Sequence, residues 1–151
     1  MDAFEARVAE FLATEKIATK RFRWTGKRDD WVRATSPIIV GGRRDLSGNL
    51  EVSAHLYRKP EKYSFTLLFR NERVFALDVR PGLAHTNKIT LETVFGTHWQ
   101  TWPSMDAVAD ERELIYKQWL DEFLKMSRNT LRVRVVLPPL GAGTQLRLFG
   151  V

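Results

Sequence analysis

Strict alternation of apolar and polar residues fills the middle of the chain and constrains the fold more than any other feature. Residues 50–57, 63–69 and 74–79 each place apolar side chains at every second position. A period of two is that of a β-strand with one face in the core. The turn Lys59-Pro60-Glu61 and the short link Asn71-Glu72 separate these three runs. The pattern therefore predicts an antiparallel meander.

Helical spacing replaces this alternation at two places. Near the N-terminus, Phe4, Val8 and Phe11 recur every three or four residues, and Asp2 is placed to cap that helix. A second, broader apolar stripe extends from about residue 110 to 126. Both stripes indicate amphipathic helices that bury one face.

Together these segments predict an α+β fold in one domain spanning residues 1–151. An antiparallel meander of about six to seven strands forms its centre, with an N-terminal helix and one C-terminal helix packed on it. Ser36-Pro37 is expected to interrupt one of the strands, and residues 138–151 to form a short strand or a loose tail. Outside the meander, strands are expected at residues 22–24, 31–35, 38–40, 89–95 and 131–137.

The composition excludes several functional classes. The chain has 151 residues and no cysteine, so disulfide frameworks, thiolate zinc sites and cysteine nucleophiles are excluded. It contains no apolar run of the about 18 residues that a membrane span needs. Its N-terminus lacks the basic and apolar regions of a signal peptide. We expect a cytoplasmic protein that needs no cofactor and does not enter a membrane.

Positive charge is concentrated in two segments. The net charge is +6, and residues 20–44 hold eight basic residues against two acids. Residues 127–151 hold four arginines and no acid. A basic face of this kind attracts phosphate backbones or an acidic protein surface, although +6 also serves solubility alone. The two segments form one binding face only if they are neighbours in space.

The basic residues of both segments alternate with apolar ones. Phe22 and Trp24 are expected to point into the core, which leaves Arg21 and Arg23 on the solvent side of the same strand. The leading hypothesis is a non-enzymatic binding module that contacts nucleic acid or a nucleoprotein complex. Its candidate binding residues are Lys20, Arg21, Arg23, Lys27, Arg28, Arg132 and Arg134.

The densest group of reactive side chains consists of Asp78, Arg80, His85 and His98. Two histidines can act as base and acid in RNA cleavage, with a cation stabilising the phosphorane, so the first alternative is a metal-independent toxin-type ribonuclease. The competing interpretation is that both histidines bind backbone groups in loops. His85 and His98 are 13 positions apart without a second ligand pair, so no metal site is expected.

Trp99 and Trp102 suggest a further alternative. Burial is the commoner fate of tryptophan, but an exposed one beside Pro103 would indicate a protein-contact site. The second alternative is therefore a protein-binding inhibitor or antitoxin-like partner.

The segment from Phe75 to Trp102 resembles a group of uncharacterised small prokaryotic proteins. In that group a strand ending near Arg-Pro is followed by His-x-Asn and then by Gly-x-His-x-His. The matching positions here are Arg80-Pro81, His85, Asn87, Gly96 and His98. Gln100 stands where the group has its second histidine, which weakens any metal or paired-histidine chemistry taken from it. The resemblance implies a prokaryotic accessory protein of mobile-element or defence context, without an established activity.

Overall fold

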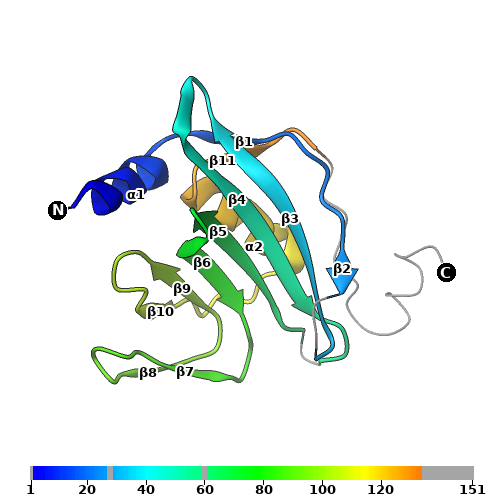
Figure 1. The fold of residues 1–151 in the computed structure, drawn as a ribbon. Coiled ribbons are helices and arrows are strands. Elements are labelled where there is room, and N and C mark those ends of the chain that lie inside the picture. Colours follow the sequence, from blue (N-terminus) through cyan, green and yellow to red (C-terminus); the bar gives the residue numbers. More distant parts are fainter. Residues whose placement is uncertain (1, 27–28, 59–60, 134–151) are drawn as a thin grey trace.

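The fold is α+β, as predicted, and combines two helices with a large, mostly antiparallel sheet (Figure 1). The computed structural model describes residues 2–26, 29–58 and 61–133. The helices are α1 (Ala3–Ala13) and α2 (Tyr116–Met126). The strands of the main sheet are β1 (Lys16–Ala18), β2 (Thr25–Gly26), β3 (Trp31–Val40), β4 (Arg43–His55), β5 (Tyr63–Phe69), β6 (Glu72–Val79), β9 (His98–Thr101), β10 (Ala107–Ala109) and β11 (Asn129–Leu131). A separate hairpin consists of β7 (Ala84–Thr86) and β8 (Thr93–Phe95).

The main sheet has nine strands, somewhat more than the six to seven expected. Its order is β10-β9-β6-β5-β4-β3-β1-β11, with β2 paired to β3 beside β1. The predicted meander forms its centre as the consecutive strands β3, β4, β5 and β6. Every pair in the sheet is antiparallel except β1 and β11, which run parallel at one edge.

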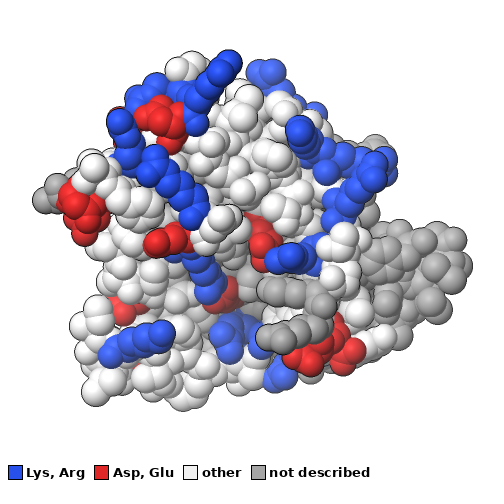
Figure 2. All heavy atoms as spheres, viewed as in Figure 1, with Lys and Arg blue, Asp and Glu red and all other residues white. Residues whose placement is uncertain are grey.

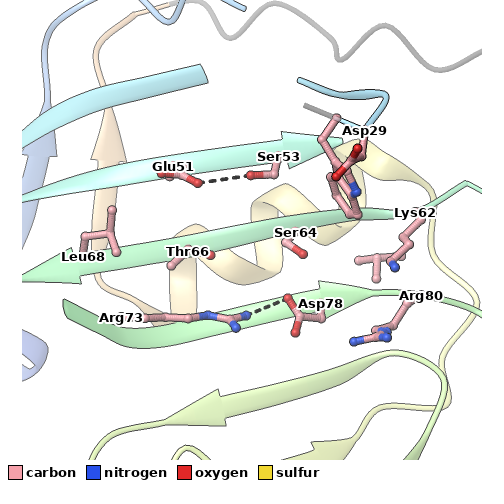
Figure 3. A pocket seen from close by; sticks show the side chains of 12 residues that line it. Asp29, Glu51, Ser53, Lys62, Ser64, Thr66, Leu68, Arg73, Asp78 and Arg80 are labelled. Carbon is pink, nitrogen blue, oxygen red and sulfur yellow. Dashed lines mark hydrogen bonds and ion pairs between the residues drawn. The ribbon is translucent and has the colours of Figure 1, made fainter. Parts of the chain in front are cut away.

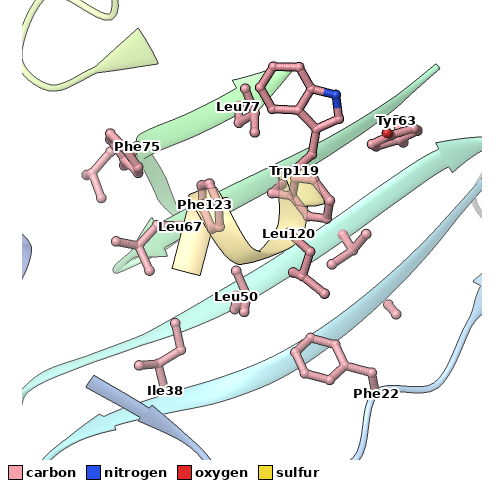
Figure 4. Packing of buried hydrophobic residues seen from close by; sticks show 14 of the residues in the cluster. Phe22, Ile38, Leu50, Tyr63, Leu67, Phe75, Leu77, Trp119, Leu120 and Phe123 are labelled. Atoms are coloured by element: carbon pink, nitrogen blue, oxygen red, sulfur yellow. The ribbon is translucent and has the colours of Figure 1, made fainter. Parts of the chain in front are cut away.

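One face of the sheet is buried under α2. Phe123 of this helix stacks at 5.7 Å on Phe65 of β5 and at 5.5 Å on Phe75 of β6. Trp119 and Leu120, on the same side of the helix, are also buried in this layer (Figure 4). Each such side chain contributes about 1.5–3 kcal/mol through loss of water contact, so this layer stabilises the domain.

Helix α1 packs at one end of the sheet, against Gly48 of β4. Phe11 of α1 lies 4.8 Å from the ring of Phe69. A Cβ atom on Gly48 would lie 2.7 Å from Phe11 Cζ and 2.2 Å from the carbonyl oxygen of Leu68, so only glycine allows this close approach. The helix begins at the predicted cap: the Glu5 amide donates to the Asp2 carboxylate over 2.7 Å.

Three sequence-based strand predictions were wrong. Residues 22–24 form no strand, because the chain between β1 and β2 has no regular structure there. Ser36-Pro37 does not interrupt β3, and Pro37 pairs with Asn49 of β4. On its other side β3 pairs with β2 at residues 32–33 and with β1 at 38–39, so within the described chain residues 34–37 need no donor there and proline is tolerated. The strand expected at residues 89–95 is only β8, because residues 87–92 form the turn of the β7–β8 hairpin.

The start of the second helix was also misplaced, at about residue 110 instead of Tyr116. Residues 107–109 form the edge strand β10, and Asp110 then accepts from the backbone amide of Arg112 at 3.2 Å and from its guanidinium at 2.8 and 3.0 Å. Such local side-chain bonds compete with helix formation. Of the predicted strand 131–137, Leu131 is the last residue of β11, while 134–151, including the expected tail, lie outside the described residues. No helix among the described residues is long and apolar enough to span a bilayer.

Candidate functional site

The face of the sheet opposite α2 presents the polar members of the alternating strands. One row crosses five strands: Arg33 lies opposite Ser53, Ser53 opposite Ser64, Ser64 opposite Asp78, and Asp78 opposite His98. The alternation that buries the apolar side chains under α2 therefore also gathers these polar groups on one surface. We call this surface the open face.

A hollow of about 470 Å³ lies on the open face. Lys62, Arg80 and Asp29 lie at one end of the labelled group, whereas Glu51 lies towards the other (Figure 3). Glu51 accepts a hydrogen bond from the Ser53 hydroxyl over 3.2 Å. The residues lining the hollow are Asp29, Trp31, Glu51, Ser53, Lys62, Ser64, Thr66, Leu68, Arg73, Asp78, Val79 and Arg80.

Asp78 is the most strongly held acid of the hollow. Its carboxylate accepts from Arg73 Nη2 at 2.7 Å, and its other oxygen lies 3.1 Å from His98 Nε2. Burial alone would raise the pKa of Asp78, but the hydrogen bond with His98, the charge of Arg73 and the Ser64 hydroxyl together hold it well below its usual range. Asp78 is therefore a carboxylate near neutral pH, with Arg73 as its counter-ion.

The structure brings the four predicted reactive residues together. Asp78 and Arg80 line the same hollow, and the His98 ring contacts Asp78. The β7–β8 hairpin folds back so that the centroid of the His85 ring lies 5.0 Å from that of His98. The convergence arises from this hairpin and not from pairing of the two histidine strands, because β7 pairs with β8 while β9 pairs with β6.

The two histidines differ in what a ligand can reach. His98 is completely buried, its Nδ1 lies 3.0 Å from the Gly96 carbonyl oxygen and its Nε2 faces Asp78. Both of its nitrogens are thus engaged inside the protein, which suits a positioning role. His85 is partly exposed, and burial together with the charges of His98 and Arg80 lowers its pKa. The cluster therefore offers a ligand one neutral imidazole near pH 7.

Lys62 and Arg80 form the basic end of the hollow. Arg80 Nε is buried without a hydrogen-bond partner among the described residues. Lys62 Nζ lies 5.1 Å above the ring of Trp31, which His55 contacts edge-on at 5.5 Å. Burial, and then the charges of Arg80 and Arg58, lower the pKa of Lys62. This end therefore combines two cations that form no ion pair among the described residues with a partly exposed aromatic ring.

The two basic segments are neighbours at the edge of the sheet. Strand β1 pairs with β11, and the Arg132 amide donates to the Ala18 carbonyl over 2.9 Å. Phe22 is buried and Trp24 packs against the core, as the alternation predicted. We define the basic edge as the exposed residues Lys20, Arg21, Arg23 and Arg132.

The basic edge adjoins the open face. Arg33, exposed on the open face, belongs to β3 and pairs with Thr25 of β2. Lys and Arg side chains gather at the upper right of Figure 2, over the segment that leads from β1 to β2 in Figure 1. Within the described ranges neither Arg33 nor any member of the basic edge forms an ion pair. The other candidate binding residues, Lys27, Arg28 and Arg134, lie outside the described residues.

The candidate protein-contact tryptophans are both half-buried. Trp99 donates from Nε1 to Asp110 over 3.0 Å and lies against Phe75 at 5.5 Å. Trp102 meets Phe4 of α1 edge-on at 5.8 Å and, with Pro103, borders an apolar hollow beside α1. Their main contacts are thus with the core, and Trp102 with Pro103 also borders a hollow.

Lys62 and Arg73 were missed as site residues. The signal was present in the β5–β6 hairpin, whose register pairs Tyr63 with Val79 and so places Lys62 beside Arg80. A count from the turn at Arg70-Asn71 alone misses this neighbour by one residue, because the register shifts between Leu67 and Leu68. Aligning the apolar rows of the two strands, so that Phe65 lies opposite Leu77, finds it. In the described part of the chain, no three acidic or histidine side chains are grouped to hold a metal ion.

No protein-family model, curated protein or solved structure matches this chain. The geometry of the open face and of the basic edge is therefore the basis for assigning a function.

Proposed function

We propose that this protein is a non-enzymatic binding module for single-stranded nucleic acid. The backbone of the strand lies along the basic edge, and its bases reach the aromatic end of the open face. The observation that supports the proposal most directly is the pairing of β1 with β11, which joins two distant basic segments into one edge.

The basic edge differs from several other cations of the protein, which form ion pairs with nearby acids. Arg7 and Arg43 bind Glu10 and Asp45 where α1 meets the β3–β4 hairpin, and Arg112 binds Asp110. These cations stabilise local structure, whereas those of the basic edge have no acidic partner among the described residues. Exposed cations without partners are available to phosphates, and their binding releases condensed counterions.

The open face favours a single strand over a duplex. Trp31 is partly exposed there, beside Lys62 and near Arg33 two residues along β3. An unpaired base can stack on an indole ring while cations hold the adjacent phosphates, but the bases of a duplex are already stacked on each other. We therefore expect little preference for sequence and a clear preference for single strands.

The test is a binding titration with a fluorescent single-stranded oligonucleotide of about 12 nucleotides, a length within the usual site size. It compares the wild type with Arg21→Gln/Arg23→Gln and with the control Lys88→Gln/Lys117→Gln. The control removes the same charge from two exposed lysines that also lack an ion pair in the described structure. Affinity is measured over a salt series.

We expect wild-type affinity to fall steeply with salt. The edge variant should bind more weakly at low salt and have a slope shallower by about 1.4, at about 0.7 per cation on a single strand. The control should keep the wild-type slope. Absent binding, a salt-independent affinity, or an equal loss in the control would each overturn the proposal.

The same samples check the ribonuclease alternative. A strand that is cut during the titration, and is left intact by His85→Ala, would support cleavage in place of simple binding. We expect the strand to stay intact, because His98 is buried with both nitrogens engaged, so of the pair His85 and His98 only His85 is accessible for proton transfer.

A further inference from the structure

We propose that the hollow on the open face is a subsite for one nucleotide that carries a phosphomonoester. Its phosphate binds Lys62 and Arg80, and its base lies against Trp31. This inference rests on the proposed function, because it names the chemical group that the open face recognises. It goes beyond that function by distinguishing a monoester dianion from the diester links of a continuous strand.

The phosphate position follows from the basic end of the hollow. Lys62 precedes β5 and Arg80 follows β6, and the pairing of Tyr63 with Val79 sets the two cations side by side. Arg80 keeps a buried Nε, a donor for which the described residues supply no acceptor. An unsatisfied buried donor costs free energy, so a ligand oxygen bonded to it gains more than one at an exposed arginine.

The remaining cation of the hollow is already neutralised. Arg73 donates to Asp78 over 2.7 Å, and Asp78 also contacts His98. In the described part of the chain Lys62 and Arg80 form no ion pair, and after burial the charge of Arg80 contributes most to the lowered pKa of Lys62, against the smaller opposing effect of Asp78. A dianion placed between them supplies two charges where two are lacking, whereas a diester supplies one.

The acids and the aromatic ring set the direction of the ligand. Glu51 lies towards the other end of the hollow and would repel a phosphate there. Exposed Asp29 lies on the same side of the hollow as Lys62 in Figure 3. Trp31 is only 5.1 Å from Lys62 Nζ, so a base and a phosphate joined by one ribose can reach both groups. The volume of about 470 Å³ is within the range of small-molecule sites and suits one nucleotide.

The experiment titrates the full chain with adenosine 5′-monophosphate, adenosine and inorganic phosphate, each followed by calorimetry. The variants are Lys62→Gln/Arg80→Gln for the hollow and Arg21→Gln/Arg23→Gln for the basic edge. We expect the mononucleotide to bind the wild type at least about tenfold more tightly than adenosine or phosphate alone, since only it fills both ends. The hollow variant should lose this binding and the edge variant should retain it.

A second arm identifies the source of the monoester. One oligonucleotide sequence is compared with a 5′-phosphate, a 3′-phosphate and two hydroxyl ends. Tighter binding of either phosphorylated strand, lost in the hollow variant, assigns the subsite to a chain end. Equal affinity of all three strands, with the mononucleotide still bound, assigns it to free nucleotides.

The outcomes separate this inference from the proposed function. If the mononucleotide does not bind, or binds the hollow variant equally well, the subsite is wrong, while salt-dependent binding of the oligonucleotide still supports the basic edge. Because a folding defect could also abolish binding, Arg80→Lys provides a milder test: it keeps the charge and removes Nε, and should weaken mononucleotide binding without abolishing it. Unchanged affinity in Arg80→Lys would contradict the role given to Nε.

Discussion

Asp78 is the residue on which the order of the open face depends. It is buried, and its two oxygens hold Arg73 from its own strand and His98 from the neighbouring strand. His98 in turn supports the ring of His85. Loss of this carboxylate should therefore loosen three side chains: Arg73 and His98, which it binds directly, and His85, which packs against His98.

We predict that Asp78→Asn lowers the free energy of unfolding at pH 7 by about 3 kcal/mol, as expected when one partner of a buried charged pair is removed. Denaturant unfolding measures this loss. Asp45→Asn is the matched control, because Asp45 has two arginine partners but is exposed, and its effect should be much smaller. A loss in Asp78→Asn no larger than in Asp45→Asn would contradict the role given to Asp78.

The same variant makes a prediction about pH. The folded-state pKa of Asp78 lies below that of an unfolded aspartate, about 3.9, so its contribution is complete above about pH 5 and disappears as the pH falls towards the folded value. The difference in stability between wild type and Asp78→Asn should therefore narrow below pH 4. A difference that stays constant down to pH 2.5 would show that it does not arise from the charge.

At the scale of elements, a buried lysine links the ends of both helices. Lys16, the first residue of β1, donates from Nζ to the carbonyls of Leu12 in the last turn of α1, of Thr14 just after α1 and of Ser127 just after α2. The last carbonyls of a helix lack partners and carry partial negative charge, so an ammonium group suits them. Lys16 thus fastens α1, β1 and α2 together at one point.

We predict that Lys16→Met, which keeps the volume and leaves these carbonyls unpaired, lowers the free energy of unfolding by about 2 kcal/mol at pH 7. Burial lowers the pKa of Lys16 to about 8. Because the unfolded chain binds this proton more tightly, wild-type stability should rise between about pH 8 and 10, and the variant should lack that rise. Exposed Lys117→Met serves as control and should follow the wild type at every pH; an identical curve for Lys16→Met would refute the prediction.

The elements differed in how far the sequence predicted them. The strands β4, β5 and β6 follow from alternation because burial on one face alone decides their side chains. The extent of β3 through Pro37 and the late start of α2 did not follow. Strand β3 continues through Pro37 because, among the described strands, none pairs with residues 34–37 on the side away from β4. Helix α2 begins late because Asp110 is hydrogen-bonded to Arg112 and Trp99.

The candidate site divides in the same way. The sequence placed Arg21 and Arg23 on the solvent side of their segment and named Asp78, Arg80, His85 and His98 as one group, since parity and proximity along the chain suffice for both. The burial of His98 could not be predicted, because it depends on the β7–β8 hairpin folding back over the sheet. Lys62 needed the register of the β5–β6 hairpin together with its shift between Leu67 and Leu68, which aligning the apolar rows of the two strands reveals.

For the whole molecule, the distribution of unpaired cations predicts two kinetic roles. Exposed charges at the rim of an interface accelerate encounter, whereas contacts in a hollow slow dissociation. We therefore predict that Arg21→Gln/Arg23→Gln mainly lowers the association rate with a 5′-phosphorylated single strand. Lys62→Gln/Arg80→Gln should mainly raise the dissociation rate.

Stopped-flow association and competition-induced dissociation measure the two rates separately. Raising the salt should slow association of the wild type towards the rate of the edge variant, because screening removes the same long-range attraction. If both variants changed only the dissociation rate, the basic edge would be an ordinary contact surface without a role in encounter.

The parallel pairing of β1 with β11 determines when, during folding, the basic edge is assembled. Each strand of the central meander can pair with the strand just before it, but β11 closes against a partner from the opposite end of the described chain. Contacts so distant in sequence form late, because their chain must first be closed into a loop. During synthesis Arg132 joins Arg21 and Arg23 only after nearly all of the domain has left the ribosome. A nascent or half-folded chain would therefore lack the complete basic edge, so full affinity for a polyanion would belong only to finished molecules.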